Sequence, residues 1–166
     1  MAGGKRSPIT AVTDFVYLRM RHRDAWRSAE AEPVDWATGL DSLRGRKYCL
    51  VTTYRRTGEA MPSPVWFGVG DDGHVYFTTE EAVGKVKRIR NDPRVRVAPA
   101  NVRGKPLGPP IEGRARIVPP ADIEGAERAI AANYGLGRKL YEAVGRRLPI
   151  DSVYVEIEPA TSPPDG

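Results

Sequence analysis

The sequence predicts a mainly β protein of the α+β class, a small barrel of antiparallel strands with peripheral helices. Two observations lead to this fold class. Short segments with alternating or β-branched residues follow one another, and turn sequences such as "RRTGEA" and "DDGH" join them. Helical patterns enter late instead of separating every pair of strands, which disfavours a parallel βαβ sheet. The expected strands are 47–55, 61–69, 74–79, 94–100, 111–118 and 152–159.

Length and composition are those of one soluble globular domain. Of the 166 residues, 40% are hydrophobic and 28% charged, and no apolar run has membrane-spanning length. We therefore expect a cytoplasmic protein with no stable membrane insertion. Cys49 is the single cysteine, which excludes an intrachain disulfide, and His22 and His74 are too far apart in sequence to indicate a metal centre. The net charge of +5 predicts an anionic partner.

Three regions are expected along the chain. Near the N-terminus, Phe15, Leu18, Trp26 and Ala29 recur at roughly helical spacing until Pro33 interrupts the pattern. Such a helix would pack on its own domain or on a second subunit, or contact a membrane or another partner. The expected regions are a helical extension at 1–40, the barrel domain at 41–160 and a tail at 161–166.

The expected strand 61–69 contains Pro62 and Pro64, neither of which can donate a backbone hydrogen bond. Because they occupy alternate positions, both missing donors fall on the same edge of the strand. This strand should therefore lie at a sheet edge, or beside something other than a strand, such as a flat ligand. In the preceding strand, Leu50 and Val51 should face opposite sides.

The stretch "TTEEAVGKVKRIR" combines hydroxyls, a glycine and positive charge at a strand-to-helix junction. Thr78 and Thr79 supply hydroxyls, Lys85 and Lys87 supply charge, and Gly84 at the N-cap would leave the first helix amides without a side-chain acceptor. Together these groups could bind a phosphate. Alternatively, Thr79 is a plain N-cap and the lysines form a solvated helix face. The residues alone leave both interpretations open.

Helical patterns follow in three places. The first begins between residues 80 and 85 and ends near "NDP", the second lies within 119–135 and starts with proline, and the third covers 136–148. The expected buried positions are Ala82, Val86 and Ile89 in the first helix, and Ile123, Ala126 and Ile130 in the second.

Three stretches of the sequence resemble the pyridoxamine-phosphate-oxidase-like split-barrel flavoproteins. They are "KYCLVTTYRRTGEAMPSPVWFGV", "VYFTTEEAVGKVKRIRNDPRVRVAPAN" and "RGKPLGPPIEGRARIV". The series looks closest to the actinobacterial branch of that family that uses the deazaflavin coenzyme F420. The resemblance runs from about Lys47 to Pro159, and the first 40 or so residues depart from it. It implies a six-stranded split β-barrel that forms a homodimer with two cofactors in grooves between the subunits.

The resemblance also implies which residues hold the cofactor. The strand matching "MPSPVWF" would lie along the isoalloxazine and ribityl portion, and the threonine and lysine cluster would close on the phosphate. The loop 101–110 would reach the ring from the other subunit. The implied cofactor-binding residues are Pro62, Ser63, Pro64, Val65, Trp66, Phe77, Thr78, Thr79, Gly84, Lys85, Lys87 and Asn101.

The implied reaction is hydride transfer between reduced F420 and a small conjugated acceptor of the quinone or enone type. The cofactor carries this chemistry, so the sequence needs no catalytic triad or metal box, and no catalytic residue is assigned. F420 is preferred to FMN because its polyglutamyl tail carries carboxylates that a basic track could bind. Residues that could form this track are Arg44, Arg46, Arg55, Arg56, Arg88 and Arg103.

Four alternatives stay open or are disfavoured. An FMN-binding oxidase or reductase of the same fold and a non-catalytic F420-binding protein both fit the residues. Pyridoxamine phosphate oxidase activity is not expected, because the C-terminal arginine and tryptophan pattern of those enzymes is missing. A nucleic-acid-binding module is disfavoured, because aromatics such as Trp66 and Phe77 fall in strands expected to hold the cofactor or the core.

Overall fold

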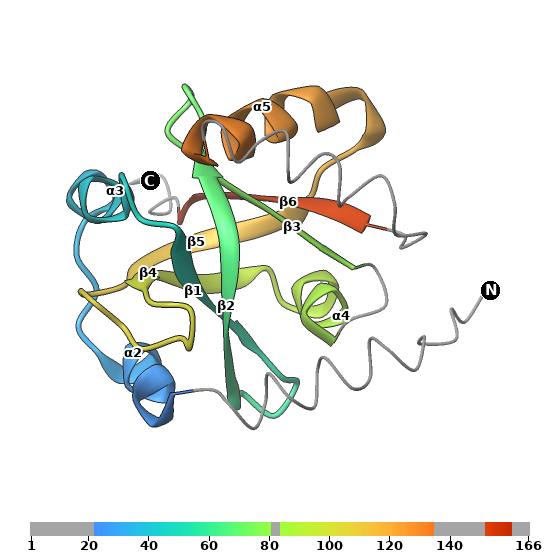
Figure 1. The fold of residues 1–166 in the computed structure, drawn as a ribbon. Coiled ribbons are helices and arrows are strands. Elements are labelled where there is room, and N and C mark those ends of the chain that lie inside the picture. The colour runs from blue at the N-terminus through green and yellow to red at the C-terminus, as the bar shows by residue number, and fades with distance from the viewer. Residues whose placement is uncertain (1–21, 81–83, 135–151, 161–166) are drawn as a thin grey trace, which may run out of the picture.

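Six antiparallel strands close into one barrel, in the order β1-β2-β3-β6-β5-β4 (Figure 1). The structure is a computed structural model that describes residues 22–80, 84–134 and 152–160. The order confirms the expected six-stranded barrel of the α+β class. The strands are β1 (Tyr48–Tyr54), β2 (Ala60–Val69), β3 (Val75–Glu80), β4 (Arg94–Ala100), β5 (Ile111–Ile117) and β6 (Ser152–Pro159).

Helices surround the barrel. α5 packs over β2 and β3 at one end, whereas α4 lies where these two strands diverge (Figure 1). Within the described residues, none of the helices has the length and apolarity needed to cross a membrane. The helical elements are η1 (Arg23–Trp26), α2 (Arg27–Glu30), α3 (Trp36–Leu43), α4 (Gly84–Asn91), η2 (Pro120–Asp122) and α5 (Ile123–Tyr134).

Strand alternation builds two separate apolar layers, as the sequence predicts for β1. Cys49 and Val51 point into the barrel and belong to the main core, together with Phe67 and Phe77. Leu50 points outward and packs in a smaller cluster formed by Ala25, Ala98 and Ala100. The inner face of β1 is therefore covered by the barrel itself, and part of its outer face is covered by the N-terminal helical segment.

The short helix α3 closes one end of the main core. Asp35 caps its N-terminus by accepting a hydrogen bond from the Thr38 backbone N–H at 3.0 Å. Leu40 and Leu43 then reach the core, and the Trp36 indole N–H donates to the Gly73 carbonyl at 2.9 Å. This helix spans the expected boundary between residues 40 and 41, so residues just before that boundary also contribute to the barrel core.

The two prolines of β2 lie in the part of this strand that pairs with another strand on one side only. The register pairs Pro62 with Thr52 and Pro64 with Leu50 on β1. On its other side, β2 pairs with β3 only from Phe67 to Val69. Within the described residues, the proline-containing half of β2 is therefore an edge towards β3, as the missing donors predict.

The predicted buried faces of α4 and α5 are also found. Val86 and Ile89 of α4 are buried, and Ala126 and Ile130 of α5 are buried against a second cluster that includes Tyr76. Ile123, also expected to be buried, is only partly buried and packs against the same cluster. The expectations for Ala82, for Phe15 and Leu18 near the N-terminus and for the segment 136–148 lie outside the described residues.

Candidate functional site

A cavity of about 280 Å³ opens at the fork where β2 and β3 separate. Four of the elements around it meet there for different reasons. The register pairs β1 with β2, and β3 continues past its last pair with β2. The helix α4 begins shortly after the end of β3. The lining residues are Tyr48, Pro64, Val65, Trp66, Thr78, Lys85 and Val102.

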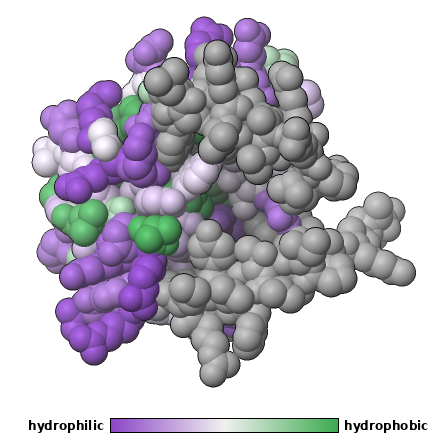
Figure 2. Space-filling view, viewed as in Figure 1, coloured by the Kyte–Doolittle hydropathy of each residue, from purple (hydrophilic) through white to green (hydrophobic). Residues whose placement is uncertain are grey.

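One wall of the cavity is aromatic. Tyr48 and Trp66 are paired across β1 and β2, and their rings meet edge-to-face with 6.4 Å between centroids. The Trp66 side chain remains 43% exposed, and Val102, in the loop between β4 and β5, is 52% exposed. On the part of the described surface visible in Figure 2, a few apolar residues (green) lie among hydrophilic ones (purple). The indole of Trp66 and the apolar side chains beside it therefore offer a ligand a surface on which a ring can pack.

The cavity lining also includes a polar residue, Thr78, and a positively charged one, Lys85. Lys85 lies at the start of α4, with its Nζ 5.7 Å from the centre of the Phe77 ring. Thr78 lies one residue beyond Phe77, and its hydroxyl donates to the Val153 carbonyl of β6 at 3.1 Å. An ammonium and a hydroxyl thus face the same space, which is the donor set that an anionic group requires.

The structure brings together five of the residues expected to bind a cofactor. Pro64, Val65, Trp66, Thr78 and Lys85 all line the cavity. The other expected residues do not line it: Pro62, Ser63, Phe77, Thr79, Gly84, Lys87 and Asn101.

Two of these other residues have structural roles in the chain. Phe77 is fully buried in the main core, beneath the lysine. The Asn101 side chain accepts hydrogen bonds at 3.0 Å from the backbone N–H groups of Arg103 and Lys105, which shapes the loop that carries Val102. Asn101 therefore orders the loop beside the cavity, and the functions expected for both residues stay predictions.

Tyr48 and Val102 were not expected at the site. Tyr48 lies on the outer face of β1, and only the register that places it opposite Trp66 brings it to the cavity. A register between two strands leaves no mark in the spacing of one strand, so no sequence signal identifies it. Val102 follows Asn101 directly, in the loop that was expected to reach a cofactor of the other subunit; it lines the cavity of its own chain, and the expected role across subunits stays a prediction.

The arginines expected to form a basic track are spread over the surface, and several already have partners. Arg88 donates from Nε to the buried Thr53 hydroxyl at 2.7 Å, which fixes α4 to β1. Arg55 lies 3.3 Å from the Glu59 carboxylate. Arg56 donates to the Asn91 side chain at 3.3 Å. Arg88 therefore has a role in packing, whereas the exposed pairs are weak and exchangeable.

The cavity lining carries no acid, histidine or cysteine in the part of the chain that the structure describes. The single cysteine, Cys49, is completely buried, and burial raises the pKa of its thiol far above its ordinary value. A thiol in this state is inert as a nucleophile. The site can therefore bind and orient a flat anionic molecule, but its own side chains do not form a nucleophile and base pair.

The closed six-stranded barrel with its strand fork defines a protein of the split-barrel class. The sequence profile of the family described as pyridoxamine 5'-phosphate oxidase matches residues 40–161. The chain therefore belongs to this family. Among curated proteins, none matches the sequence significantly.

Solved structures share the fold at low sequence identity. A conserved hypothetical protein from Mycobacterium tuberculosis is 19% identical, with 85% of this chain and 86% of that chain covered and a TM-score of 0.57. An FAD binding protein from Mycobacterium smegmatis is 18% identical over 77% and 92% of the two chains, with a TM-score of 0.51. The heme storage protein HutZ from Vibrio cholerae is 14% identical over 70% and 84%, also at 0.51. At these identities the likeness shows the fold alone.

Proposed function

We propose that the protein is an F420-dependent oxidoreductase that transfers a hydride between reduced deazaflavin and a small conjugated acceptor of the quinone or enone type. The observation that carries this proposal is the composition of the cavity at the β2–β3 fork. It combines an aromatic wall with an ammonium and a hydroxyl, while its described lining lacks acids, histidine and cysteine. Such a site needs a bound cofactor for redox chemistry.

The residues present fit a flat ring with a phosphate-bearing tail. Trp66 and Pro64 present apolar surface, and the open edge of β2 leaves backbone groups available to the edge of a ring. When bound, the deazaflavin supplies the hydride that the acceptor receives. The protein orients the ring against Trp66 and keeps water from the face that the wall covers.

The polar end of the cavity fits the phosphate. Lys85 would donate a charge-assisted hydrogen bond, and Thr78 would turn its hydroxyl from the Val153 carbonyl towards the anion. Thr79, Gly84 and Lys87 lie next to these two residues in sequence and would complete the cradle on its outer side. This role is one of the two that the strand-to-helix sequence leaves open.

The arginines expected to form a basic track, and not Lys85, would favour F420 over FMN, because both cofactors carry the phosphate that Lys85 would bind and only F420 extends it with a polyglutamyl tail. Arg55, an exposed cation at the end of β1, forms a weak surface ion pair with Glu59. Such a cation can leave its surface carboxylate and bind a carboxylate of the polyglutamyl tail instead. Homodimer formation would cover exposed Trp66 and Val102 and bring Asn101 of each chain towards the cofactor of its partner. An FMN-dependent enzyme and a non-catalytic F420 carrier are the alternatives.

Haem is disfavoured at this cavity. Haem iron takes an axial ligand from His, Cys, Met or Tyr. In the described lining only Tyr48 belongs to this set, and its ring packs against Trp66. The cavity therefore supports a flavin-type ring better than an iron porphyrin.

Fluorescence titrations of the protein with F420 and with FMN, run side by side, test the identity of the cofactor. We expect F420 to bind tighter. Lys85→Ala should weaken binding by about ten- to a hundredfold, which corresponds to one charge-assisted hydrogen bond. Arg90→Ala, more than a turn further along α4, is the matched control and should weaken binding less, with a loss that shrinks as salt is added. Tighter binding of FMN would transfer the proposal to the FMN-dependent alternative.

Turnover is tested separately from binding. Oxidation of reduced F420 by quinone and enone acceptors should require the protein and should slow in Lys85→Ala at subsaturating cofactor. Tight F420 binding without acceptor reduction would identify a carrier. Equal and negligible losses of binding in Lys85→Ala and Arg90→Ala would reject the cavity as the phosphate site.

A further inference from the structure

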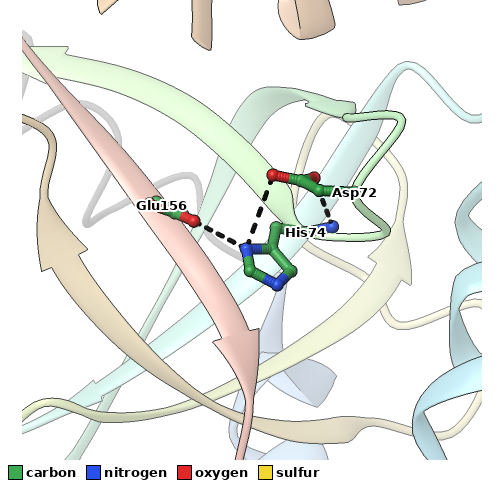
Figure 3. Close-up of side chains that lie close together, drawn as sticks. All are labelled: Asp72, His74 and Glu156. Atoms are coloured by element: carbon green, nitrogen blue, oxygen red, sulfur yellow. Dashed lines mark hydrogen bonds and ion pairs between the residues drawn. The ribbon is translucent and has the colours of Figure 1, made fainter. Parts of the chain in front are cut away.

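A second group of polar side chains lies at the other end of β3, away from the cavity. His74 ends the turn between β2 and β3, and its Nδ1 lies 2.6 Å from Oε1 of Glu156 on β6 (Figure 3). The same nitrogen lies 3.6 Å from Oδ2 of Asp72, in the turn itself. Three side chains from two distant segments of the chain therefore point towards one space.

The local fold fixes this convergence. Gly73 adopts φ 77° between Asp72 and His74, so the turn doubles back and both side chains face β6. The register that pairs Tyr76 with Glu156 places the glutamate directly beside the turn. The positions are therefore set by backbone pairing and not only by the attraction between the side chains.

Neighbouring residues hold the two carboxylates in place. The Tyr76 hydroxyl donates to Asp72 Oδ2 at 2.5 Å. Arg116 donates from Nε to Oε2 of Glu156 at 2.7 Å, which leaves Oε1 directed at the imidazole. Hydrogen bonds to the carboxylates from outside are the arrangement that orients ligands around metal ions in proteins.

We propose that Asp72, His74 and Glu156 form a binding site for a divalent transition-metal ion of the zinc class. The ligand atoms, one imidazole nitrogen and two carboxylate oxygens, lie within 4.8 Å of one another. Zinc bonds of about 2.0–2.2 Å in tetrahedral geometry place ligand atoms roughly 3.3 Å apart. Movements of the order of 1 Å therefore suffice to coordinate the ion, with water at the fourth position.

A proton shared by His74 and Glu156 is the competing explanation. It leaves the Asp72 carboxylate held by the Tyr76 hydroxyl and by the His74 backbone N–H, which donates to Oδ1 at 2.9 Å. At 3.6 Å, Asp72 Oδ2 is too far from Nδ1 to accept a hydrogen bond from it. A proton on Nδ1 therefore serves Glu156 alone, whereas a metal ion between the three atoms would engage Asp72 as well. The buried Glu156, with its side chain 8% exposed, would anchor the ion, and Asp72, 46% exposed, leaves an entry path from solvent.

Such an ion would connect the β2–β3 turn to β6. None of its three ligands lines the cavity at the fork. The site is therefore independent of the proposed oxidoreductase function. Because a metal that binds the folded state and not the unfolded state stabilises it by mass action, the expected consequence is higher thermal stability.

Thermal unfolding of the full chain, prepared without a polyhistidine tag and stripped with EDTA, provides the test. We expect Zn²⁺ at a hundredfold excess over its Kd to raise Tm by about 5 to 10 °C, with one ion bound per chain by calorimetry. Mg²⁺ should have no such effect, because it prefers six oxygen ligands. His74→Ala should abolish the rise.

The chain offers a matched control in its other histidine. His22 Nδ1 also lies 3.6 Å from one carboxylate oxygen, on Asp24, and this pair is not part of the three-residue cluster. His22→Ala should retain the full Zn²⁺ effect. A Tm rise that is absent in the wild-type chain, or that persists undiminished in His74→Ala, would overturn the site and leave the cluster as an ion pair held by a proton.

A second pair of variants covers the case in which His74→Ala does not fold. Asp72→Asn keeps the shape of an exposed side chain and should weaken Zn²⁺ binding at least tenfold. Tyr76→Phe keeps the ring in its cluster, removes only the hydroxyl that orients Asp72, and should weaken binding by about tenfold. Unchanged Zn²⁺ affinity in both folded variants would reject the proposal as firmly as failure of the first test.

Discussion

The two faces of β2 contrast within a single strand. On the inner face, Val65 and Phe67 are buried in the main core. On the outer face, Pro64 and Trp66 line the cavity, and Gly68 lies against the backbone of α5. Val65 and Phe67 are both buried, although Val65 also borders the cavity, whereas the outer face changes from exposed Trp66 to buried Gly68 within two residues.

This difference separates the residues that stabilise the fold from the residues that remain exposed and can bind a ligand. Val65 and Phe67 lose nearly all of their apolar surface to one core, so their stabilisation of the fold scales with buried area. The outer face is covered only where a helix approaches, and the uncovered part keeps an indole at the surface. Substitutions on the two faces should therefore have different consequences for stability and for binding.

Removing the largest inner side chain should have the largest effect. Phe67→Ala should lower the free energy of unfolding by about 3 to 5 kcal/mol, because it leaves a cavity in the main core. Urea unfolding followed by circular dichroism measures this loss. Phe67→Leu, which keeps most of the volume, should lose about 1.5 kcal/mol or less. Similar losses for both variants would contradict the close packing of this face.

A single methyl group added to the closed part of the outer face should have the next largest effect. In Gly68→Ala the new Cβ would lie 2.0 Å from the Ala129 carbonyl oxygen, so α5 must move. We expect a loss of about 1 to 3 kcal/mol in urea unfolding.

The same helix supplies the control for this prediction. A Cβ at Gly125 meets nothing within 4 Å. Gly125→Ala should therefore stabilise the protein by up to about 1 kcal/mol through its higher helix propensity. A tolerated Gly68→Ala, or a destabilising Gly125→Ala, would show that α5 does not approach β2 as closely as the structure indicates.

Removing the N-cap of α3, the helix that closes the main core, should have a smaller effect on stability, and this effect should depend on pH. Hydrogen bonds from the Thr38 hydroxyl and backbone N–H hold the pKa of Asp35 below its ordinary value of 3.8. The carboxylate therefore contributes stability that is complete above about pH 3.8 and is lost as the pH falls through the lower folded-state pKa.

Asp35→Ala and Asp35→Asn separate the two parts of this effect. Asp35→Ala should lower the urea midpoint at pH 7 by less than Gly68→Ala does, and its difference from wild type should shrink below pH 3.8. Asp35→Asn retains an acceptor and should stay close to wild type at pH 7, with a weaker acid dependence. An Asp35→Ala deficit that is constant down to pH 2.5 would exclude the charge as its source.

The strands could be predicted from sequence because burial on one face imposes period-two alternation, and because Pro62 and Pro64 mark an edge. The helix α3 was missed. Its sequence "WATGLDSL" contains few strong helix formers, and Gly39 is required because a Cβ there would lie 1.8 Å from the Ile111 side chain. Tertiary packing, which local propensity does not record, stabilises this helix.

The same distinction, between local sequence features and long-range contacts, applies to the cavity at the fork and to the proposed metal site. Thr78 and Lys85 could be identified because a strand end and a helix start are local features with a chemical signature. The pairing of Tyr48 with Trp66 depends on strand register, and Glu156 meets His74 across 82 positions of sequence. Contacts of this kind follow from closing the barrel, so reading segments one at a time could not reveal them.

Trp66, on the open part of the outer face, should give the smallest change in stability and a clear change in binding. It is 43% exposed, so Trp66→Ala should change the free energy of unfolding by less than about 1 kcal/mol. If the aromatic wall holds the ring of the cofactor, the same variant should weaken F420 binding about tenfold, because stacking on an indole contributes about 1 to 3 kcal/mol per ring. Trp26, similarly exposed at 40% on η1 but not part of the cavity, is the matched control. Trp26→Ala should leave F420 affinity unchanged, and equal affinity losses in the two variants would mean that the cavity at the fork is not where the ring binds.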